Sequence, residues 1–416
     1  MKVAVIGAGV IGVTTAYELA AQGHDVSVYE RSSSSAEGCS FANAGVISPG
    51  YVTPWAKPGM TLHILKHLWR AHSPVRLSHP SWDEVKWLWR WWRACDEGTF
   101  VQNRARLLRL STYSHQRLQR LTERLHIEHD RTPGYMVLLR GEQEHQMVQP
   151  SLKIMRDAGL SFKTLSASEA RDIEPALNPD TPLAYALHFP NDEVGNCRQF
   201  TLLLKNIAES KGVKFHFNAS VQALSPSEPR RIRIGTADPG IVFDGVVVCA
   251  GLGSAHLLAP VGLHIPLAAV HGYSVSASVR EPLDAPRSGV MDERYKVAIS
   301  RLGQRVRVSG SAEIGSNARQ HHAASVKTLY RVLDDWFPGA ARTQENLQVW
   351  KGSRPMLPDG PPLVGQTHTD GVWVNLGHGS SGWALSCGSA KALADQLSGR
   401  QPDIDMHGFA WGRLKT

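Results

Sequence analysis

The first thirty residues constrain the fold most, because they combine an apolar run, three spaced glycines, a helical segment and a second apolar run. Val3–Ile6 is continuous and apolar, as in a strand buried on both faces. Gly7, Gly9 and Gly12 follow at the G-x-G-x-x-G spacing, and Val26–Tyr29 is expected to form the second strand. This order predicts the strand–turn–helix–strand unit of a doubly wound α/β domain.

Each position of this turn has a physical reason to bind a dinucleotide. Gly7 permits the tight turn, Gly9 lets a pyrophosphate approach the backbone, and Gly12 lets helix and strand pack closely. The helix N-terminus offers N–H groups to the phosphates. Glu30 closes the second strand, near the usual spacing of about 20 residues, and can accept hydrogen bonds from ribose hydroxyls. The alternative is a glycine-rich turn that binds nothing.

Composition excludes several other classes of function. The net charge of +8 favours anionic ligands, but it is too modest and too dispersed to indicate nucleic-acid binding. Five cysteines without a C-x-x-C pair indicate a reducing compartment, the cytoplasm, and no disulfide framework. The histidines lack ligand spacing, so no metal site is expected. No apolar run reaches the length of a membrane span, and the apolar start serves the predicted strand rather than a leader.

A loop of small residues, Cys39–Gly45, follows the first unit and could lie against a flat ring system, with an ordinary loop as the alternative. The strings G-A-G-V-I-G and S-F-A-N-A-G-V-I-S-P-G-Y, then W-A-K-P-G, resemble the FAD-dependent D-amino acid dehydrogenase family. That family is a branch of the group that holds glycine oxidase, sarcosine oxidase and D-amino acid oxidase. The resemblance extends to about residue 400 and implies FAD as the cofactor. We expect non-covalent binding, since no cysteine matches an attachment site; Cys39 is the nearest thiol.

Three later strings extend the resemblance. Residues 246–254 resemble the V-x-A-x-G-x-x-S string, with Gly251 directly after Ala250, and this string lies near the adenine half in related flavoproteins. Gly377–Gly382 follows an expected strand and forms a second glycine-containing helix N-terminus, suited to the flavin carbonyl edge. Arg354, in R-P-x-x-x-D-G, is the expected bidentate partner of a substrate carboxylate, with a structural salt bridge as the alternative.

Two further residues are weaker candidates. His378 is expected at the flavin edge, and Tyr273, in a string resembling P-x-x-G-Y-S, at the pocket wall, although each could equally be a packed residue. The candidate catalytic residues are therefore Arg354, His378 and Tyr273. The candidate FAD-binding residues are Gly7, Ala8, Gly9, Val10, Ile11, Gly12, Glu30, Arg31, Ser40, Ala42, Asn43, Ala44, Gly45, Ala250, Gly251, Gly377, His378, Gly379, Ser380, Ser381 and Gly382.

Residues 61–130 are expected to be helical and are rich in tryptophan and basic residues. Tryptophans with basic side chains between them suit a membrane surface. They also suit the core of a helical insertion whose charges reach the solvent at its edge. Both interpretations remain open, so peripheral contact with the inner face of the cell membrane is one expectation. The basic residues of 107–125 are expected to form a solvated face.

The resemblance implies an α/β protein in which a Rossmann-like FAD-binding domain is interleaved with a mixed-sheet substrate domain that carries a helical insertion. We expect the FAD-binding domain at residues 1–60, 196–262 and 350–416, and the substrate domain at 61–195 and 263–349. Asn196 replaces an aspartate that is usual in the related enzymes, and we expect it still to cap the following helix. A capping box is expected at Ser166, and short strands at Val221–Leu224 and its neighbours.

The implied reaction is oxidative deamination of D-amino acids to 2-oxo acids and ammonia, with electrons passed to a quinone or other carrier rather than to oxygen. The expected partners are thus an amino acid and an electron acceptor. One alternative is an oxidase or dehydrogenase of a cyclic or secondary amino acid, such as a D-hydroxyproline-, glycine- or sarcosine-like substrate. Another is a non-catalytic subunit that carries FAD.

Overall fold

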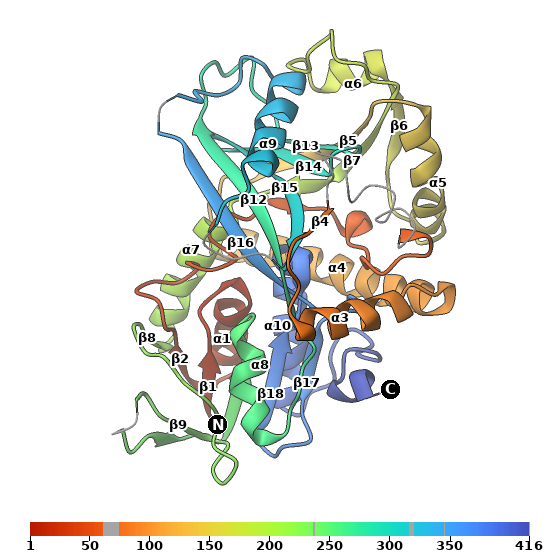
Figure 1. The fold of residues 1–416 in the computed structure, drawn as a ribbon. Coiled ribbons are helices and arrows are strands. Elements are labelled where there is room, and N and C mark those ends of the chain that lie inside the picture. The colour runs from red at the N-terminus through yellow and green to blue at the C-terminus, as the bar shows by residue number, and fades with distance from the viewer. Residues whose placement is uncertain (61–74, 236–237, 316–319, 345, 416) are drawn as a thin grey trace.

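The computed structural model describes residues 1–60, 75–235, 238–315, 320–344 and 346–415 (Figure 1). Two sheets organise this part of the chain. A six-stranded sheet occupies the lower half of Figure 1 and a ten-stranded sheet the upper half. Within the described ranges, no helix is long and apolar enough to cross a membrane.

The six-stranded sheet has the order β17-β18-β11-β1-β2-β8. Its strands are β1 (Lys2–Ile6), β2 (Asp25–Tyr29), β8 (Lys214–His216), β11 (Gly245–Val248), β17 (Leu363–Gln366) and β18 (Val372–Leu376). The helices around it are α1 (Val10–Ala21), α7 (Cys197–Ser210), α8 (Gly253–Leu258) and α10 (Gly382–Leu397). All of its strand pairs are parallel except that of β17 with β18.

The central strand β1 is buried on both faces, as its apolar run predicts. Val3 and Val5 pack in one apolar core with α1, α7 and α10. Ala4 and Ile6 pack in a second core on the opposite side, with residues of α8 and β11. Because both faces are covered, the positions of β1 show no polar alternation.

The ten-stranded sheet is mixed and runs β16-β12-β15-β14-β13-β5-β7-β3, with β4 against β15 and β6 against β7. Its strands are β3 (Val46–Ile47), β4 (Val75–Leu77), β5 (Thr132–Leu139), β6 (Lys163–Ser166), β7 (Tyr185–Val194), β12 (Ala268–Ser278), β13 (Gly289–Asp292), β14 (Val297–Leu302), β15 (Arg305–Ile314) and β16 (Gln348–Met356). The helices α5 (Glu142–Asp157), α6 (Ala167–Ile173) and α9 (Ala323–Trp336) lie beside it in the upper half of Figure 1. A separate two-stranded sheet holds β9 (Arg231–Ile232) and β10 (Ile241–Val242).

The two faces of the β16-β12-β15 region differ in character. Residues opposite one another in a strand pair share a face. Tyr273, Val275 and Val308 belong to one face, and they pack in an apolar core with Leu329 and Trp336 of α9. We call this the covered face. The other, which we call the site face, carries glycines, serines, Trp350 and three arginines, which are Arg305, Arg307 and Arg354.

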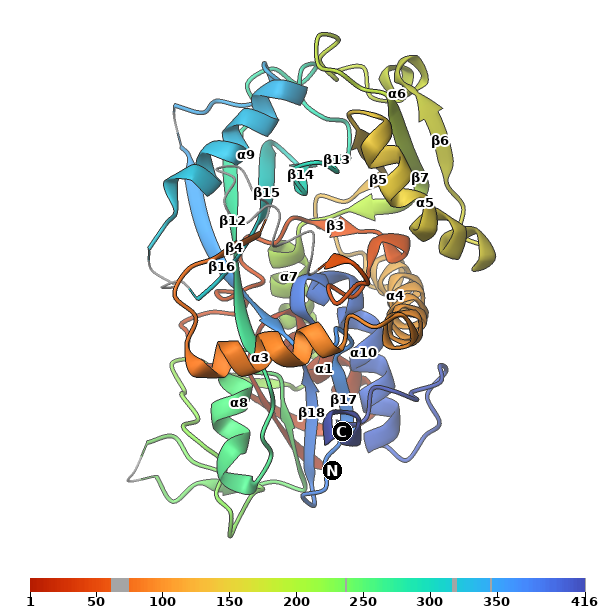
Figure 2. The ribbon, with the colours of Figure 1, turned by 45° about the vertical axis from the view of Figure 1, so that its right-hand side comes forward.

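Two helices lie between the sheets, α3 (Trp82–Arg93) and α4 (Glu97–Leu125). Figure 2 shows α3 crossing the front of the molecule at the boundary between the upper and lower halves. The helix α4 packs against α10. Its basic residues are not all solvated as expected, because Arg117 forms a two-bond ion pair with buried Glu18, at 2.8 and 2.7 Å. Arg124 donates to the Tyr17 hydroxyl at 2.7 Å.

Local sequence signals account for several element ends. Ser166 forms the expected capping box with Glu169 at the start of α6. The Asn196 side chain accepts from the Gln199 N–H, so the asparagine caps α7 as expected. The strand expected at Val221–Leu224 is wrong, since only an isolated bridge from Val221 to Ile234 forms there. The domain boundaries stay a prediction, and β16 crosses the one placed at 349/350.

Candidate active site

The predicted nucleotide turn lies where β1 meets α1. Gly7 has a φ of +104°, and a Cβ there would lie 2.7 Å from the Cys249 carbonyl oxygen. A Cβ on Gly12 would overlap the Gly7 carbonyl oxygen, so this glycine is required for the close approach of helix and turn. A Cβ on Gly9, by contrast, would have only the Ser40 Oγ nearby, at 3.4 Å. The backbone at Gly9 is therefore open, as a pyrophosphate cradle requires.

The acid at the end of β2 is fixed beside this turn. The two oxygens of Glu30 accept hydrogen bonds from the Ala8 N–H at 2.7 Å and the Ser32 N–H at 2.9 Å. Each oxygen keeps a second lone pair that a ribose hydroxyl could use. Glu30 therefore holds the shape of the turn, a structural role that the sequence pattern alone does not reveal, while its contact with a ribose stays a prediction.

The loop of small residues connects the nucleotide turn to the ten-stranded sheet. Ser40 Oγ accepts from the Val10 N–H of α1 at 3.0 Å. The Phe41 ring lies 4.5 Å from the Trp350 ring of β16, centroid to centroid. The Asn43 carbonyl oxygen accepts from Arg307 Nη1 of β15 at 2.9 Å. The loop thus lies on the site face, between the two sheets.

Other predicted FAD residues are placed at the same end of the six-stranded sheet. Ala250 follows β11 and lies next to Gly7, since a Cβ on Gly7 would be 3.1 Å from its Cα. Gly377 directly follows β18, and a short 3₁₀ turn, Gly379–Ser381, leads into α10. Arg31 and Ser380 are exposed. The open backbone at Gly9, the fixed acid and this second glycine turn fit a bound dinucleotide, while the individual contacts stay a prediction.

Arg354 lies on the site face and extends over the neighbouring strand. A Cβ on Gly272 would be only 2.6 Å from Arg354 Nη1, so the guanidinium rests directly on the Gly272 backbone. Nη1 donates to the Ser311 carbonyl oxygen at 2.9 Å. Among the described residues, no carboxylate lies within ion-pair distance of this cation. Desolvation lowers the pKa of the Arg354 guanidinium, and the alternative of a structural salt bridge is not realised in the described part of the chain.

His378 is buried and directed into α10. Its Nε2 is 3.0 Å from the Ser389 Oγ, and burial lowers the pKa of the imidazole to about 3. The ring is therefore neutral at neutral pH and secures the turn after β18. The Met356–His378 bridge places this turn two residues beyond Arg354 along β16. A role of the turn at the flavin edge stays a prediction.

Tyr273 is packed on the opposite face of the strand from Arg354. It belongs to the covered face, where its hydroxyl donates to Glu313 Oε2 at 2.7 Å and accepts from the His322 N–H at 3.0 Å. Burial, with the bond to Glu313, raises the pKa of the phenol. This position fits the alternative of a packed residue, because strand alternation directs its neighbours Gly272 and Ser274 to the site face. A place of Tyr273 at the pocket wall stays a prediction.

The sequence analysis did not single out the site-face residues of β12, β15 and β16. Buried Arg307 donates to Ser276 Oγ at 2.8 Å, in addition to its bond to the loop. Desolvation lowers the pKa of Arg307 to about 10. The alternation of Ser274 and Ser276 with Tyr273 and Val275 is the signal that could have indicated a polar face.

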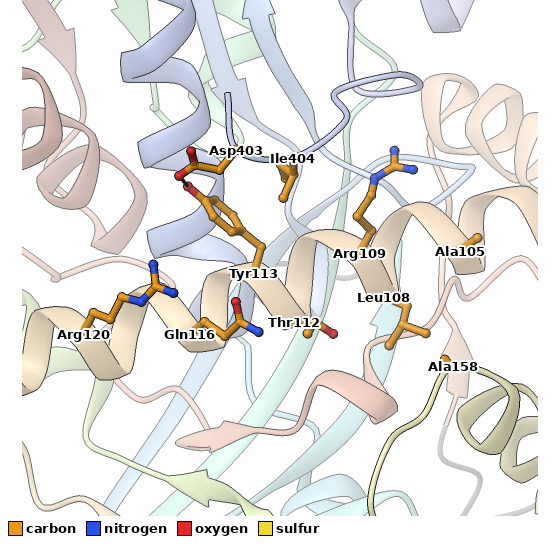
Figure 3. Close-up of a pocket in the computed structure, with 10 residues that line it drawn as sticks. All are labelled: Ala105, Leu108, Arg109, Thr112, Tyr113, Gln116, Arg120, Ala158, Asp403 and Ile404. Carbon is orange, nitrogen blue, oxygen red and sulfur yellow. Dashed lines mark hydrogen bonds between the residues drawn. The ribbon is translucent and has the colours of Figure 1, made fainter. Parts of the chain in front are cut away.

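Two other features of the described residues bear on the chemistry of the protein. No group of three or more His, Cys, Asp or Glu side chains is placed to hold a metal ion there. A groove of about 700 Å³ lies along α4, where Arg109, Tyr113 and Arg120 line it together with Asp403 (Figure 3). None of the predicted FAD or substrate residues lines this groove.

The chain is similar to known proteins over almost its whole length. The DAO family model, described as FAD dependent oxidoreductase, matches residues 2–396. A protein named D-amino acid dehydrogenase from Bradyrhizobium diazoefficiens is 38% identical over 98% of this chain and 97% of its own length. Among solved structures, glycine oxidase from Geobacillus kaustophilus has a TM-score of 0.75 at 23% identity, covering 99% of this chain and 98% of that one. L-proline dehydrogenase from P. horikoshii has a TM-score of 0.76 at 16% identity, covering 100% and 97%. At these identities the two structures show a shared fold alone.

Proposed function

Because this chain belongs to the DAO family of FAD-dependent oxidoreductases, we propose that it catalyses the oxidative deamination of D-amino acids to 2-oxo acids and ammonia. Bound FAD supplies the acceptor for the Cα hydrogen and its electron pair. The substrate class follows the D-amino acid dehydrogenase relative, which resembles this chain over almost its whole length.

The observation that carries the proposal is the cation on the site face. Arg354 is partly buried, and no carboxylate of the described residues lies within ion-pair distance of it. Its fork is fixed over Gly272, and Nη1 is held by the Ser311 carbonyl oxygen. A substrate carboxylate would complete its coordination by a bidentate pair. Such a pair would hold the Cα–H in one orientation toward the glycine turns at the other side of the site.

The experiment is anaerobic reduction of the purified holoenzyme by a panel of amino acids. We expect D-amino acids to bleach the flavin absorbance and their L-enantiomers to leave it unchanged. Bleaching by glycine, sarcosine or D-hydroxyproline in preference to primary D-amino acids would instead support the cyclic or secondary amine alternative. A flavin that no amino acid bleaches would support the non-catalytic alternative.

The same preparation identifies the acceptor class. We propose that electrons pass to a quinone or another carrier, following the dehydrogenase relative. Turnover should be slow in air and fast with a soluble quinone or dye. Hydrogen peroxide formed in proportion to 2-oxo acid, at the rate that the dye supports, would identify an oxidase.

We also propose that α3 binds an anionic lipid surface. Its inner side is anchored, since Trp87 and Trp91 are buried, and Trp87 Nε1 donates to the Met356 carbonyl oxygen at 3.0 Å. On its outer side Trp82, Trp89 and Trp92 are 81%, 53% and 56% exposed. The tryptophans are therefore partly core and partly surface, so neither interpretation of the sequence accounts for all of them. Three basic residues accompany the exposed rings: Lys86, Arg90 and Arg93.

Basic residues attract anionic headgroups of opposite charge. Exposed tryptophan rings favour the interfacial region between headgroups and acyl chains. Lys86→Gln combined with Arg90→Gln should weaken sedimentation with phosphatidylglycerol vesicles about 30-fold, at about 1 kcal/mol for each charge. Trp89→Ser should also weaken it, whereas Leu283→Ser, at a side chain 84% exposed elsewhere, should not. Absence of wild-type binding at low salt would contradict the proposal. So would a Trp89→Ser variant that changes only the oligomeric state.

A further inference from the structure

A row of three polar side chains crosses the site face beside Arg354. Ser274 of β12 lies opposite Ser309 of β15 on one side and opposite Trp350 of β16 on the other. Residues in such register share a face, so the three side chains lie next to one another. The Phe41 ring of the loop between the sheets packs on Trp350, which places the row inside the candidate active site.

The polar atoms of this row are buried and unpaired. Ser274 Oγ, Ser309 Oγ and Trp350 Nε1 are inaccessible to solvent and have no hydrogen-bond partner among the described residues. Ser274 and Ser309 are 3% and 9% exposed as whole residues. Buried polar atoms in folded proteins are normally paired with protein, ordered water or ligand. Three unpaired atoms in one row therefore indicate a ligand that pairs with them.

The spacing from Arg354 fits an amino acid. The guanidinium rests on Gly272, which lies two residues before Ser274 on the same face, or about 7 Å at the rise of a strand. Trp350 Nε1 leans back toward the same place, since a Cβ on Gly352 would lie 3.4 Å from it. Gly352 is the cross-strand neighbour of Gly272. A carboxylate held by Arg354 thus leaves the substrate side chain at the row.

We propose that Trp350, Ser274 and Ser309 form the side-chain subsite of the enzyme and select D-amino acids whose side chain carries an uncharged hydrogen-bond acceptor. This inference rests on the proposed function and names its substrate class. The indole N–H is only a donor, while each hydroxyl can donate or accept, so an amide or hydroxyl side chain can pair with all three. An apolar substrate side chain of the same size leaves the indole N–H and the two hydroxyls unpaired. A site with buried polar groups discriminates against such a substrate.

The test compares D-asparagine with D-leucine, which are similar in shape, in steady-state assays of the holoenzyme with a dye acceptor. We expect the wild type to have a kcat/KM at least tenfold higher for D-asparagine. Three variants should each reduce the ratio of kcat/KM for D-asparagine to kcat/KM for D-leucine severalfold or more: Ser274→Ala, Ser309→Ala and Trp350→Phe. The change should come mainly from a lower kcat/KM for D-asparagine. The flavin absorbance and FAD retention should stay as in the wild type.

Ser300→Ala is the matched control. Ser300 is also buried on this face with an unpaired hydroxyl, but it lies opposite Arg307, one row further from Arg354. This variant should keep the wild-type ratio. A wild type without preference between the two substrates would overturn the subsite, and so would row variants that alter FAD retention but not the ratio. Failure to oxidise any D-amino acid would instead overturn the proposed function itself.

Discussion

Arg354→Ala is expected to lower kcat/KM for every D-amino acid by roughly 10²–10³-fold or more. Removing one partner of a desolvated charge pair costs about 3–5 kcal/mol, because the other charge is left buried and unpaired. The fork over Gly272 is held in one orientation, so kcat should fall together with kcat/KM. Steady-state assays with a dye acceptor measure both constants. Arg354→Lys should recover only part of the lost kcat/KM, because an ammonium cannot form two parallel bonds with a carboxylate.

Two further variants sharpen this test. Gly272→Ala keeps the arginine but places a Cβ against its guanidinium, so it should reproduce much of the loss by displacing the fork. Arg301→Ala is the control, since Arg301 also donates to backbone carbonyl oxygens, those of Gly303 and Pro282, but lies on the face opposite the site face. All variants should remain yellow. If kcat and KM of Arg354→Ala are normal, another cation must bind the substrate carboxylate, and Arg307 is the first candidate.

Gly9→Ala and Gly12→Ala are expected to fail in different ways, although both change a glycine of one turn. A Cβ on Gly12 overlaps the Gly7 carbonyl oxygen, so the turn must open at a cost of about 3 kcal/mol or more. A Cβ on Gly9 meets only the Ser40 hydroxyl at 3.4 Å, so the fold should survive. It occupies the place where the pyrophosphate approaches, however, and FAD affinity should fall by about tenfold or more.

Denaturant midpoints of the apoproteins and fluorescence titration with FAD separate the two effects. Gly12→Ala should shift the midpoint, while Gly9→Ala should shift mainly the FAD dissociation constant. Gly38→Ala is the control, because a Cβ there meets no atom within 4 Å and its φ is not positive. A Gly9→Ala variant that retains FAD like the wild type would show that the pyrophosphate does not approach this backbone.

The nucleotide half of the site could be predicted from sequence because its determinants are local. The turn at Gly7, the acid at Glu30 and the Ser40 loop lie within 40 residues of one another, and each depends on backbone geometry that short strings specify. The caps at Ser166 and Asn196 could be predicted for the same reason.

The substrate half could be predicted only in part, because the face that a strand residue occupies depends on distant pairing. The string R-P-x-x-x-D-G singled out Arg354, which lies on the site face, but the string around Tyr273 could not decide between the pocket wall and a packed position. The face of β12 is set by its register with β15 and β16, which a one-residue slip would invert. Trp350 was missed for the same reason: no local pattern reveals that its indole lies beside Ser274.

The order of strands in the six-stranded sheet has a consequence for synthesis of the chain. β1 pairs with β11, whose register begins at Gly245, and β11 pairs with β18, whose register begins at Val372. The first strand made by the ribosome therefore waits for nearly the whole chain before its sheet is complete. Such long sequence separation between partners slows folding. β1 has β2 beside it early, but it lacks its second strand neighbour until residue 248 is made, so one edge of the apolar run Val3–Ile6 stays unpaired over that interval and is exposed to wrong partners.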